Sequence, residues 1–361
     1  MSESKYEMGC VPGRHHHFKT YNDTVDVISS WETIFGVYDE YFPRYQFDRF
    51  PDDVESNMEY VPDFSVYFNS DYGIVAKILP QAKSSEPEEI SEKLLEMCDA
   101  IEEGYEIEES NGTSKNPEMV DIVAFVPDDY SSQFGDILAT RFNEGYSLDP
   151  NLVLIRYGMD DQRANYVFQR ETRLEQEFRE EHLPDEQSLS DTIGPDGGYQ
   201  AYRLGTKEFL RSKTHKPIYN VEPPESYLAS YLWMKVFPTE LSDMDFQAWR
   251  EGKIVSNEEI TVRPPSLQQT LNTQRIEDGE VNMEWIENCL QFLSTARQAD
   301  EANGRYDVKY TGLIKDIDIS GENSSSKKHE RRRELAITLI RRYCKYSGNL
   351  EDDSQTSLGQ F

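Results

Sequence analysis

An acidic residue at the start of a predicted strand is the position in this sequence best suited to chemistry. Residues 61–69 and 73–79 are rich in β-branched and aromatic side chains, and Ser70-Asp71-Tyr72 between them favours a turn. This pattern predicts an antiparallel hairpin. Pro62-Asp63 opens its first strand, and Lys77 lies near the end of its second. The hairpin therefore carries an active site, an active site that has lost its function, or no site.

The hairpin resembles part of the PD-(D/E)XK nuclease-like superfamily, as do the helix predicted before it and the alternating helices and buried strands after it. The resemblance covers residues 21–170. In that family a Pro-Asp pair opens one strand, an acidic-x-Lys triplet lies on the next, and the preceding helix often adds a Glu. The resemblance implies Asp63, Glu32 and Lys77 as candidate catalytic residues, of which Asp63 and Glu32 would hold the metal if the site is active. The family's carboxylates hold Mg²⁺, which neutralises the phosphodiester and lowers the pKa of the attacking water.

The second motif of the family is not matched. When the hairpin is paired as in the family, Lys77 takes the acidic position and Leu79 takes the lysine position. Lys77 cannot ligate a metal, and a one-residue slip offers only apolar side chains and reverses the strand's faces. Asp71 would be a replacement ligand from the turn. Three interpretations remain: an active nuclease with a migrated motif, a nuclease-derived fold without catalysis in which Lys77 pairs with Asp63, and an unrelated α/β domain.

A basic amphipathic helix predicted over residues 330–346 is the second candidate site. Its region is the only strongly basic segment of the chain. The candidate nucleic-acid-binding residues are Lys327, Lys328, Arg331, Arg332, Arg333, Arg341, Arg342 and Lys345. The alternative is a helix whose charged face is simply solvated.

The composition of the chain is strongly acidic. The 361 residues include 68 Asp and Glu against 37 Lys and Arg, which gives a formal net charge of −31. Such a field repels polyanions, so nucleic-acid binding requires a locally basic surface. The acidity also suits molar salt, where charges are screened. The spread of acidic residues through both halves of the chain favours this halophilic interpretation.

The cysteines and the N-terminus predict a cytoplasmic protein. Cys10, Cys98, Cys289 and Cys344 lie far apart and form no CxxC pair, which favours reduced thiols over a zinc site. No apolar run is long enough for a membrane span, and the first residues lack a signal peptide's apolar region. We expect residues 1–20 to form a flexible arm, because they show little apolar periodicity. The three adjacent histidines, His15 to His17, cannot all face one metal; the alternative is that Cys10 folds back to join one of them as a ligand.

Residues 21–183 are predicted to form an α/β domain with a restriction-endonuclease-like mixed sheet flanked by helices. Helical periodicity covers residues 23–41, 86–103 and 130–143. Nearly continuous apolar runs at 120–126 and 152–157 predict strands buried on both faces, and a further strand is expected at 164–169. A polar linker over residues 184–222 ends this domain.

Residues 223–346 are predicted to form a winged-helix-like domain that ends in the basic helix. Helical patterns at 226–236, 244–250, 265–271 and 283–293 precede a hairpin about Asn303-Gly304. The alternative is another small helical domain with a β-hairpin. Residues 347–361 are expected to be a disordered tail.

These features predict a non-catalytic or weakly active nuclease-like protein that binds nucleic acid or a protein assembly. Residues 283–293, the following hairpin and the basic helix would form the nucleic-acid surface. One alternative is an active Mg²⁺-dependent nuclease that uses Asp63, the only case in which a metal cofactor is expected. The other is an acidic scaffold or interaction protein of a virus or defence system that binds a basic protein partner.

Overall fold

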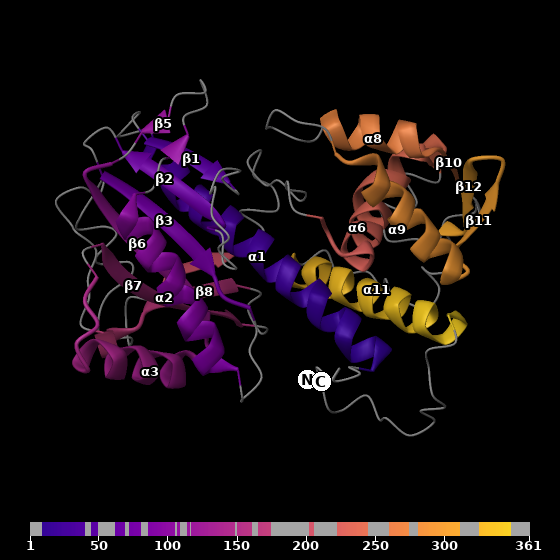
Figure 1. Ribbon diagram of the computed structural model, residues 1–361. Helices are drawn as coiled ribbons and strands as arrows, with labels where there is room; N and C mark the ends of the chain where they lie inside the picture. Colours follow the sequence, from indigo (N-terminus) through magenta and orange to yellow (C-terminus); the bar gives the residue numbers. More distant parts are fainter. Residues whose placement is uncertain are drawn as a thin grey trace. The chain divides into compact units, whose positions relative to one another are not determined.

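The computed structural model divides the chain into two compact units. It describes residues 9–39, 45–49, 62–68, 72–80, 86–104, 107–108, 114–115, 117–148, 150–160, 165–174, 202–205, 222–244, 260–273, 281–310 and 325–347. One unit comprises residues 23–215, and the other combines residues 1–22 with residues 216–361. The division between them falls inside the first helix, α1 (Cys10–Asp39) (Figure 1).

The unit of residues 23–215 is a mixed α/β structure built on one sheet. The strands are β1 (Tyr45–Arg49), β2 (Phe64–Phe68), β3 (Tyr72–Ile78), β6 (Met119–Pro127), β7 (Asn151–Asp160), β8 (Asn165–Arg170) and β9 (Tyr202–Gly205), in that spatial order. β3, β6 and β7 are parallel to one another, and every other neighbouring pair in this sheet is antiparallel. A separate small pair joins β4 (Ile107–Glu108) to β5 (Ser114–Lys115).

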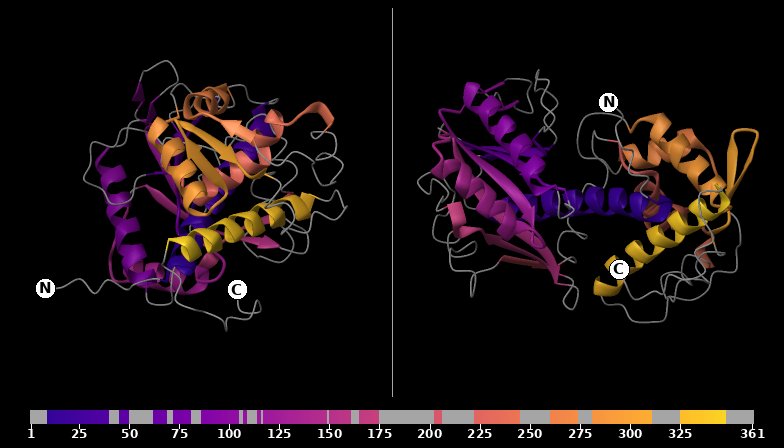
Figure 2. Two further views of the ribbon diagram at one scale, coloured as in Figure 1. Left: turned by 90° about the vertical axis from the view of Figure 1, so that its right-hand side faces the viewer. Right: turned by 60° about the horizontal axis from the view of Figure 1, so that its bottom comes forward.

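Helices cover both faces of the parallel strands. α2 (Pro87–Glu103) and α3 (Ser131–Asn143) lie side by side on one face (Figures 1 and 2). Alternate residues of β6, Ile122, Ala124 and Val126, pack in the same apolar cluster as these two helices. Phe125 points to the other face, where its ring lies 5.1 Å from that of Trp31 in α1. The apolar runs at 120–126 and 152–157 are therefore buried on both faces, as the sequence predicted.

A buried polar network joins the parallel strands near their starts. The Tyr72 hydroxyl donates to Asp121 Oδ2 at 2.5 Å, and the Asn151 amide donates to Asp121 Oδ1 at 3.2 Å. Asp121 is fully buried, and the three residues lie on β3, β6 and β7. Because an unpaired buried carboxylate is costly, this network favours one register of the three strands.

Two predictions about the segments before and after the α/β domain are wrong. α1 begins at Cys10, so residues 10–20 are helical and not a flexible arm. Within the predicted linker, β9 pairs with β8 and extends the sheet. Neither element has a clear periodic pattern, because the first turns of α1 are polar and β9 is only four residues long. The linker residues 184–201 and 206–221 lie outside the described residues, as do residues 348–361 of the predicted tail.

The other unit is a helical structure with a small sheet. Its elements begin with α6 (Glu225–Tyr231), the π-helical turn η3 (Leu232–Val236) and the 3₁₀ turn η4 (Phe237–Glu240). β10 (Ile260–Val262), α8 (Pro264–Thr273), α9 (Met283–Thr295), β11 (Ala299–Ala302), β12 (Arg305–Val308) and α11 (Ser325–Tyr346) follow. The predicted helix at 244–250 falls almost wholly outside the described residues.

The hairpin about Asn303-Gly304 is confirmed. Both residues have positive φ, 54° and 72°, which a two-residue hairpin turn of the predicted type requires. β10 pairs with the outer side of β12, so the sheet has the order β10-β12-β11. The hairpin extends beyond the end of α9 (Figures 1 and 2). β10 was not predicted, because a three-residue strand carries too little periodicity to detect.

Candidate functional site

The structure brings Asp63 and Lys77 together at the edge of the sheet where β3 ends. The Asp63 backbone N–H donates to Ala76 O at 2.8 Å, which extends the β2–β3 pairing by one residue. Lys77 Nζ lies 3.1 Å from Asp63 Oδ1. The ion pair between adjacent strands that the sequence suggested for these two residues is thus formed.

Protein groups hold both oxygens of the Asp63 carboxylate. Oδ1 accepts from Lys77, and Oδ2 accepts from the Ile78 backbone N–H at 2.6 Å. The residue is only 7% exposed. Burial raises the pKa of Asp63 above its ordinary value, while the charge of Lys77 and the Ile78 hydrogen bond oppose that rise. Asp63 is therefore a buried, oriented group and not an open carboxylate.

The residues described here do not fit a magnesium site. Mg²⁺ takes oxygen ligands, but both Asp63 carboxylate oxygens are already held by Lys77 Nζ and the Ile78 N–H, and Lys77 adds a positive charge beside them. Leu79 is fully buried, and its N–H donates to Phe125 O. No group of three His, Cys, Asp or Glu side chains suited to a metal occurs within the described part of the chain. Position 32 is in α1, but the Glu32 side chain and all of Asp71 lie outside that part.

Two tyrosines that the sequence did not single out complete this edge of the sheet. Tyr157 of β7 donates to Leu79 O at 3.3 Å, and Tyr130 donates to Pro80 O at 2.5 Å. Burial raises the pKa of Tyr157, and the charges of Asp23 and Asp63 add to that rise. Asp23 of α1 is itself buried. The chain leaving β3 is thus held by hydroxyl donors, which is a structural role.

Asp128 follows β6 on the same edge of the sheet. Its N–H donates to Tyr157 O, and its carboxylate lies 3.9 Å from Arg156 Nε. Burial raises the pKa of Asp128, whereas Arg156 lowers it. A Cβ on Gly158 would come within 2.5 Å of Asp128 Oδ2, so the glycine makes room for this carboxylate. An acidic residue directly after a buried strand was the sequence signal that could have identified it.

The basic helix is divided between the core and the surface. Arg332 is only 8% exposed, and its guanidinium lies over the Tyr227 ring at 5.2 Å from the centroid. Its prediction as a nucleic-acid contact is therefore wrong. Arg341 and Lys345 are exposed, and Arg333 and Arg342 are half-buried. Lys327, Lys328 and Arg331 belong to α11, but their side chains lie outside the described ones.

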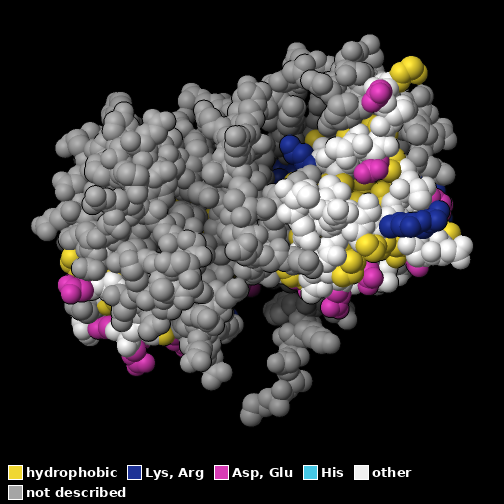
Figure 3. All heavy atoms as spheres, turned by 90° about the horizontal axis from the view of Figure 1, so that it is seen from above, with side chains coloured by type: hydrophobic (Ala, Val, Ile, Leu, Met, Phe, Trp, Pro, Cys, Tyr) yellow, Lys and Arg dark blue, Asp and Glu magenta, His cyan; other side chains and the backbone are white. Residues whose placement is uncertain are grey.

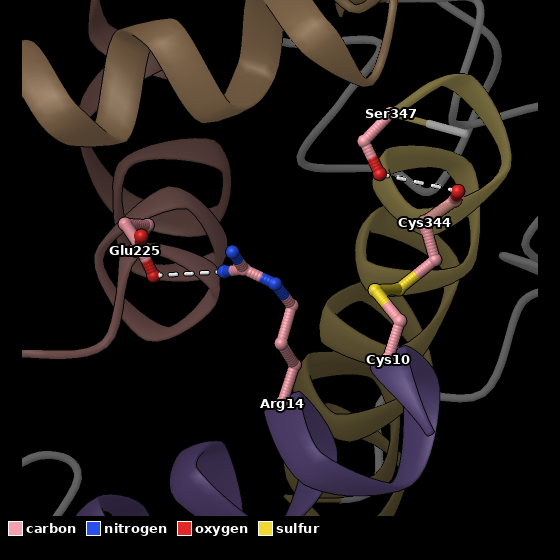
Figure 4. The surroundings of a disulfide bond; sticks show 5 residues. All are labelled: Cys10, Arg14, Glu225, Cys344 and Ser347. Carbon is pink, nitrogen blue, oxygen red and sulfur yellow. Dashed lines mark hydrogen bonds and ion pairs between the residues drawn. A yellow bond between two sulfur atoms is a disulfide. The ribbon is translucent and has the colours of Figure 1, made fainter. Parts of the chain in front are cut away.

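The first turns of α1 pack against the last turns of α11. Cys10 and Cys344 form a disulfide whose Cα atoms are 5.9 Å apart (Figure 4). The prediction of four reduced cysteines is therefore wrong for this pair. The two cysteines are 334 residues apart in sequence, so no local pattern could have predicted the bond. Cys98 and Cys289 are free and buried. Because Cys10 is disulfide-bonded, it is not available as a metal ligand beside the histidines.

Arg14 links three elements of this unit. Its Nη1 lies 3.1 Å from Glu225 Oε2 of α6 (Figure 4). Its guanidinium stacks over the Tyr343 ring, 4.1 Å from the ring centroid. Tyr343 in turn stacks on Phe292 of α9, with ring centroids 4.8 Å apart. A pocket of about 280 Å³ beside Arg14 is also lined by His17, Glu222 and Glu225. Both basic and acidic side chains line this pocket, and Arg14 already pairs with Glu225.

None of the described helices is both long enough and apolar enough to cross a membrane. Comparisons of this chain with family models, curated proteins and solved structures gave no match.

Proposed function

We propose that this protein binds nucleic acid through the unit that contains α6 to α11, and that its other unit is a nuclease-like domain without catalysis. The observation that carries the second part is the 3.1 Å contact between Lys77 Nζ and Asp63 Oδ1. A lysine ammonium there supplies the charge that a metal would otherwise bring. The carboxylate is satisfied without a cation from solution.

The arrangement around the hairpin supports the nuclease-like assignment. A helix, α1, precedes the hairpin β2–β3, and β3 is followed by α2 and then by β6 parallel to β3. Asp63 stands at the start of β2, where the resemblance places the family's Pro-Asp pair. A fold depends on its apolar pattern and not on its site, so such a domain can persist after its catalytic residues are replaced.

The other unit supports the nucleic-acid part of the proposal. α8 and α9 are followed by the hairpin β11–β12, and β10 completes a three-stranded sheet with it. This order of helices and hairpin is like that of a winged-helix domain, a class of domain that often binds DNA. α11 adds exposed basic residues to the same unit.

The proposal is tested by measuring binding and cleavage together. Labelled single- and double-stranded DNA and RNA are incubated with the full-length protein in Mg²⁺ or Mn²⁺, from low to molar KCl. We expect binding that weakens as salt rises, and no cleavage. Molar KCl is included because a chain with a net charge of −31 can require it to fold.

Two variants separate the possible failures. Metal-dependent cleavage that is lost in Asp63→Asn, but kept in the exposed-surface control Asp243→Asn, would show an active nuclease and contradict the catalytic part. An absence of nucleic-acid binding at every salt concentration would contradict the binding part, and tight association with a basic protein would then support a scaffold.

A further inference from the structure

The winged-helix-like elements carry the wrong charge to hold a phosphate backbone. α9 contains Glu284 and Glu287 and no Lys or Arg, and α8 contains no charged residue. In the hairpin, Lys309 is paired with Asp300 at 2.7 Å, and Asp307 lies on the strand with Arg305. On the face of this unit seen in Figure 3, Lys and Arg side chains appear at separate places among acidic ones. Phosphate binding therefore needs another surface of the unit.

At the start of α1 and the end of α11, basic residues outnumber acidic ones. Residues 10–22 include Arg14, three histidines and Lys19, and they contain no acidic residue. Arg341 and Lys345 are one turn apart on α11, and both are exposed. Glu334 is the one acidic residue of α11 among positions 331–346. In a chain of net charge −31, this is a local reversal of sign.

The two basic segments lie together in the folded unit. The Cys10–Cys344 disulfide joins them at one end (Figure 4), where Arg14 also stacks on Tyr343. Further along, Phe18 and Arg332 both contact the Tyr227 ring, so the segments remain close over several turns. Burial lowers the pKa of His15, and the charges of Arg333, Lys19, His16 and Arg341 lower it further. Charges from both helices thus act on the same side chain.

We infer that the first turns of α1 and the last turns of α11 form one cationic surface, which binds the sugar-phosphate backbone of nucleic acid without reading its sequence. Its exposed or half-buried Lys and Arg residues are Lys19, Arg333, Arg341, Arg342 and Lys345. His16 and His17 lie on the same turns of α1, whereas His15, whose pKa is lowered, adds no charge at neutral pH. This inference rests on the proposed nucleic-acid binding and places it on α1 and α11, away from α9 and the hairpin.

The physical reason is electrostatic. Several like charges held close together repel one another, and a phosphate backbone removes that repulsion while releasing its own counterions. The fixed packing of α1 on α11 holds these charges in place, so fewer degrees of freedom are lost on binding. Side chains of Lys and Arg that contact phosphates position a duplex but do not distinguish its bases.

The test compares three double variants that each remove two positive charges. The surface variant is Lys19→Gln/Arg341→Gln, the hairpin variant is Arg305→Gln/Lys309→Gln, and the control in the other unit is Lys93→Gln/Arg141→Gln. Fluorescence anisotropy of the full-length protein with a labelled 20-bp DNA duplex is measured from 50 to 500 mM KCl. A second duplex of unrelated sequence tests sequence dependence.

We expect only the surface variant to change binding markedly. Each phosphate contact contributes about 0.9 to the slope of log affinity against log salt for duplex DNA, so this slope should become shallower by about 1.8. The affinity near 0.1 M KCl should fall roughly 10- to 100-fold. The two duplexes should bind within about 3-fold of each other, since backbone contacts carry no sequence information.

Each other outcome has a defined meaning. A larger loss in the hairpin variant, an equal loss in all three variants, or no loss in any variant would overturn the inference while leaving nucleic-acid binding intact. A wild-type protein that binds neither duplex would instead overturn the proposed function. Unchanged thermal unfolding, and recovered binding in the charge-conserving variant Lys19→Arg/Arg341→Lys, exclude misfolding as the cause of a loss.

Discussion

Replacing Lys77 by Met is expected to lower the free energy of unfolding at pH 7 by about 3–5 kcal/mol, because it leaves Asp63 buried without its cation. Side chains of this pair are only 15% and 9% exposed, so water replaces little of the lost interaction. Met keeps most of the apolar stem of the lysine, which limits the loss of packing. Urea unfolding, followed by tryptophan fluorescence, measures the change.

The effect of Lys77→Met should depend on pH in a defined direction. Burial already raises the pKa of Asp63, and removing Lys77 removes a group that opposes this rise. The unfolded chain releases the proton above about pH 3.9, whereas the folded variant holds it to higher pH. The variant's deficit is therefore small below about pH 4 and grows as the pH rises through the raised folded pKa.

Two further variants show whether buried charge is the cause. The double variant Asp63→Asn/Lys77→Met keeps an acceptor for the Ile78 N–H but has no charge to bury, so it should be more stable than Lys77→Met at pH 7. Lys93→Met is the matched control, since Lys93 pairs with Glu89 at 2.8 Å in an exposed i,i+4 bridge. It should cost only about 0.3–0.5 kcal/mol. An equal and pH-independent cost for Lys77→Met and Lys93→Met would contradict the interpretation of the site.

The second large effect is expected from the disulfide. The variant Cys10→Ser/Cys344→Ser should lose about 2–5 kcal/mol of stability, because the bond closes a loop across 334 residues and restricts the unfolded chain. The bond also holds the first turn of α1 against α11. Differential scanning calorimetry of the wild type with and without a dithiol reductant measures the same loss in a single protein.

The single variant Cys10→Ser provides the control for the reductant. It lacks the bond, so the dithiol should leave its unfolding unchanged. Burial raises the pKa of both free thiols, Cys98 and Cys289, which keeps them protonated and unreactive in the folded protein. Alkylation in denaturant without reductant should label two cysteines, and labelling of all four would show that the bond is absent.

Local patterns were sufficient for the elements that bury an apolar face. The two central strands, β6 and β7, are continuous apolar runs, and α2, α3, α8 and α9 have clear helical spacing. The hairpin at 303–304 needs backbone conformations that Asn and Gly readily adopt. Each of these features depends on residues close in sequence, which is why the sequence predicted them.

Features that depend on distant residues escaped such prediction. β9 and β10 are short, and each is defined by the strand beside it. The first turns of α1 are mostly polar, so the sequence does not predict a helix there. Packing against α6 and α11 stabilises these turns as helix. Arginine is usually exposed, but Arg332 is buried because it packs over the Tyr227 ring.

The candidate site shows the same division. The sequence by itself determined that Asp63 and Lys77 lie on the two strands of one hairpin, and that one helix is basic within a chain of net charge −31. Only the tertiary structure decided that Lys77 neutralises Asp63, and that Cys10 and Cys344 bring the two basic segments together. The reason is physical: residue type fixes the charge that a side chain carries, whereas burial and the partners brought near by folding fix what that charge can do.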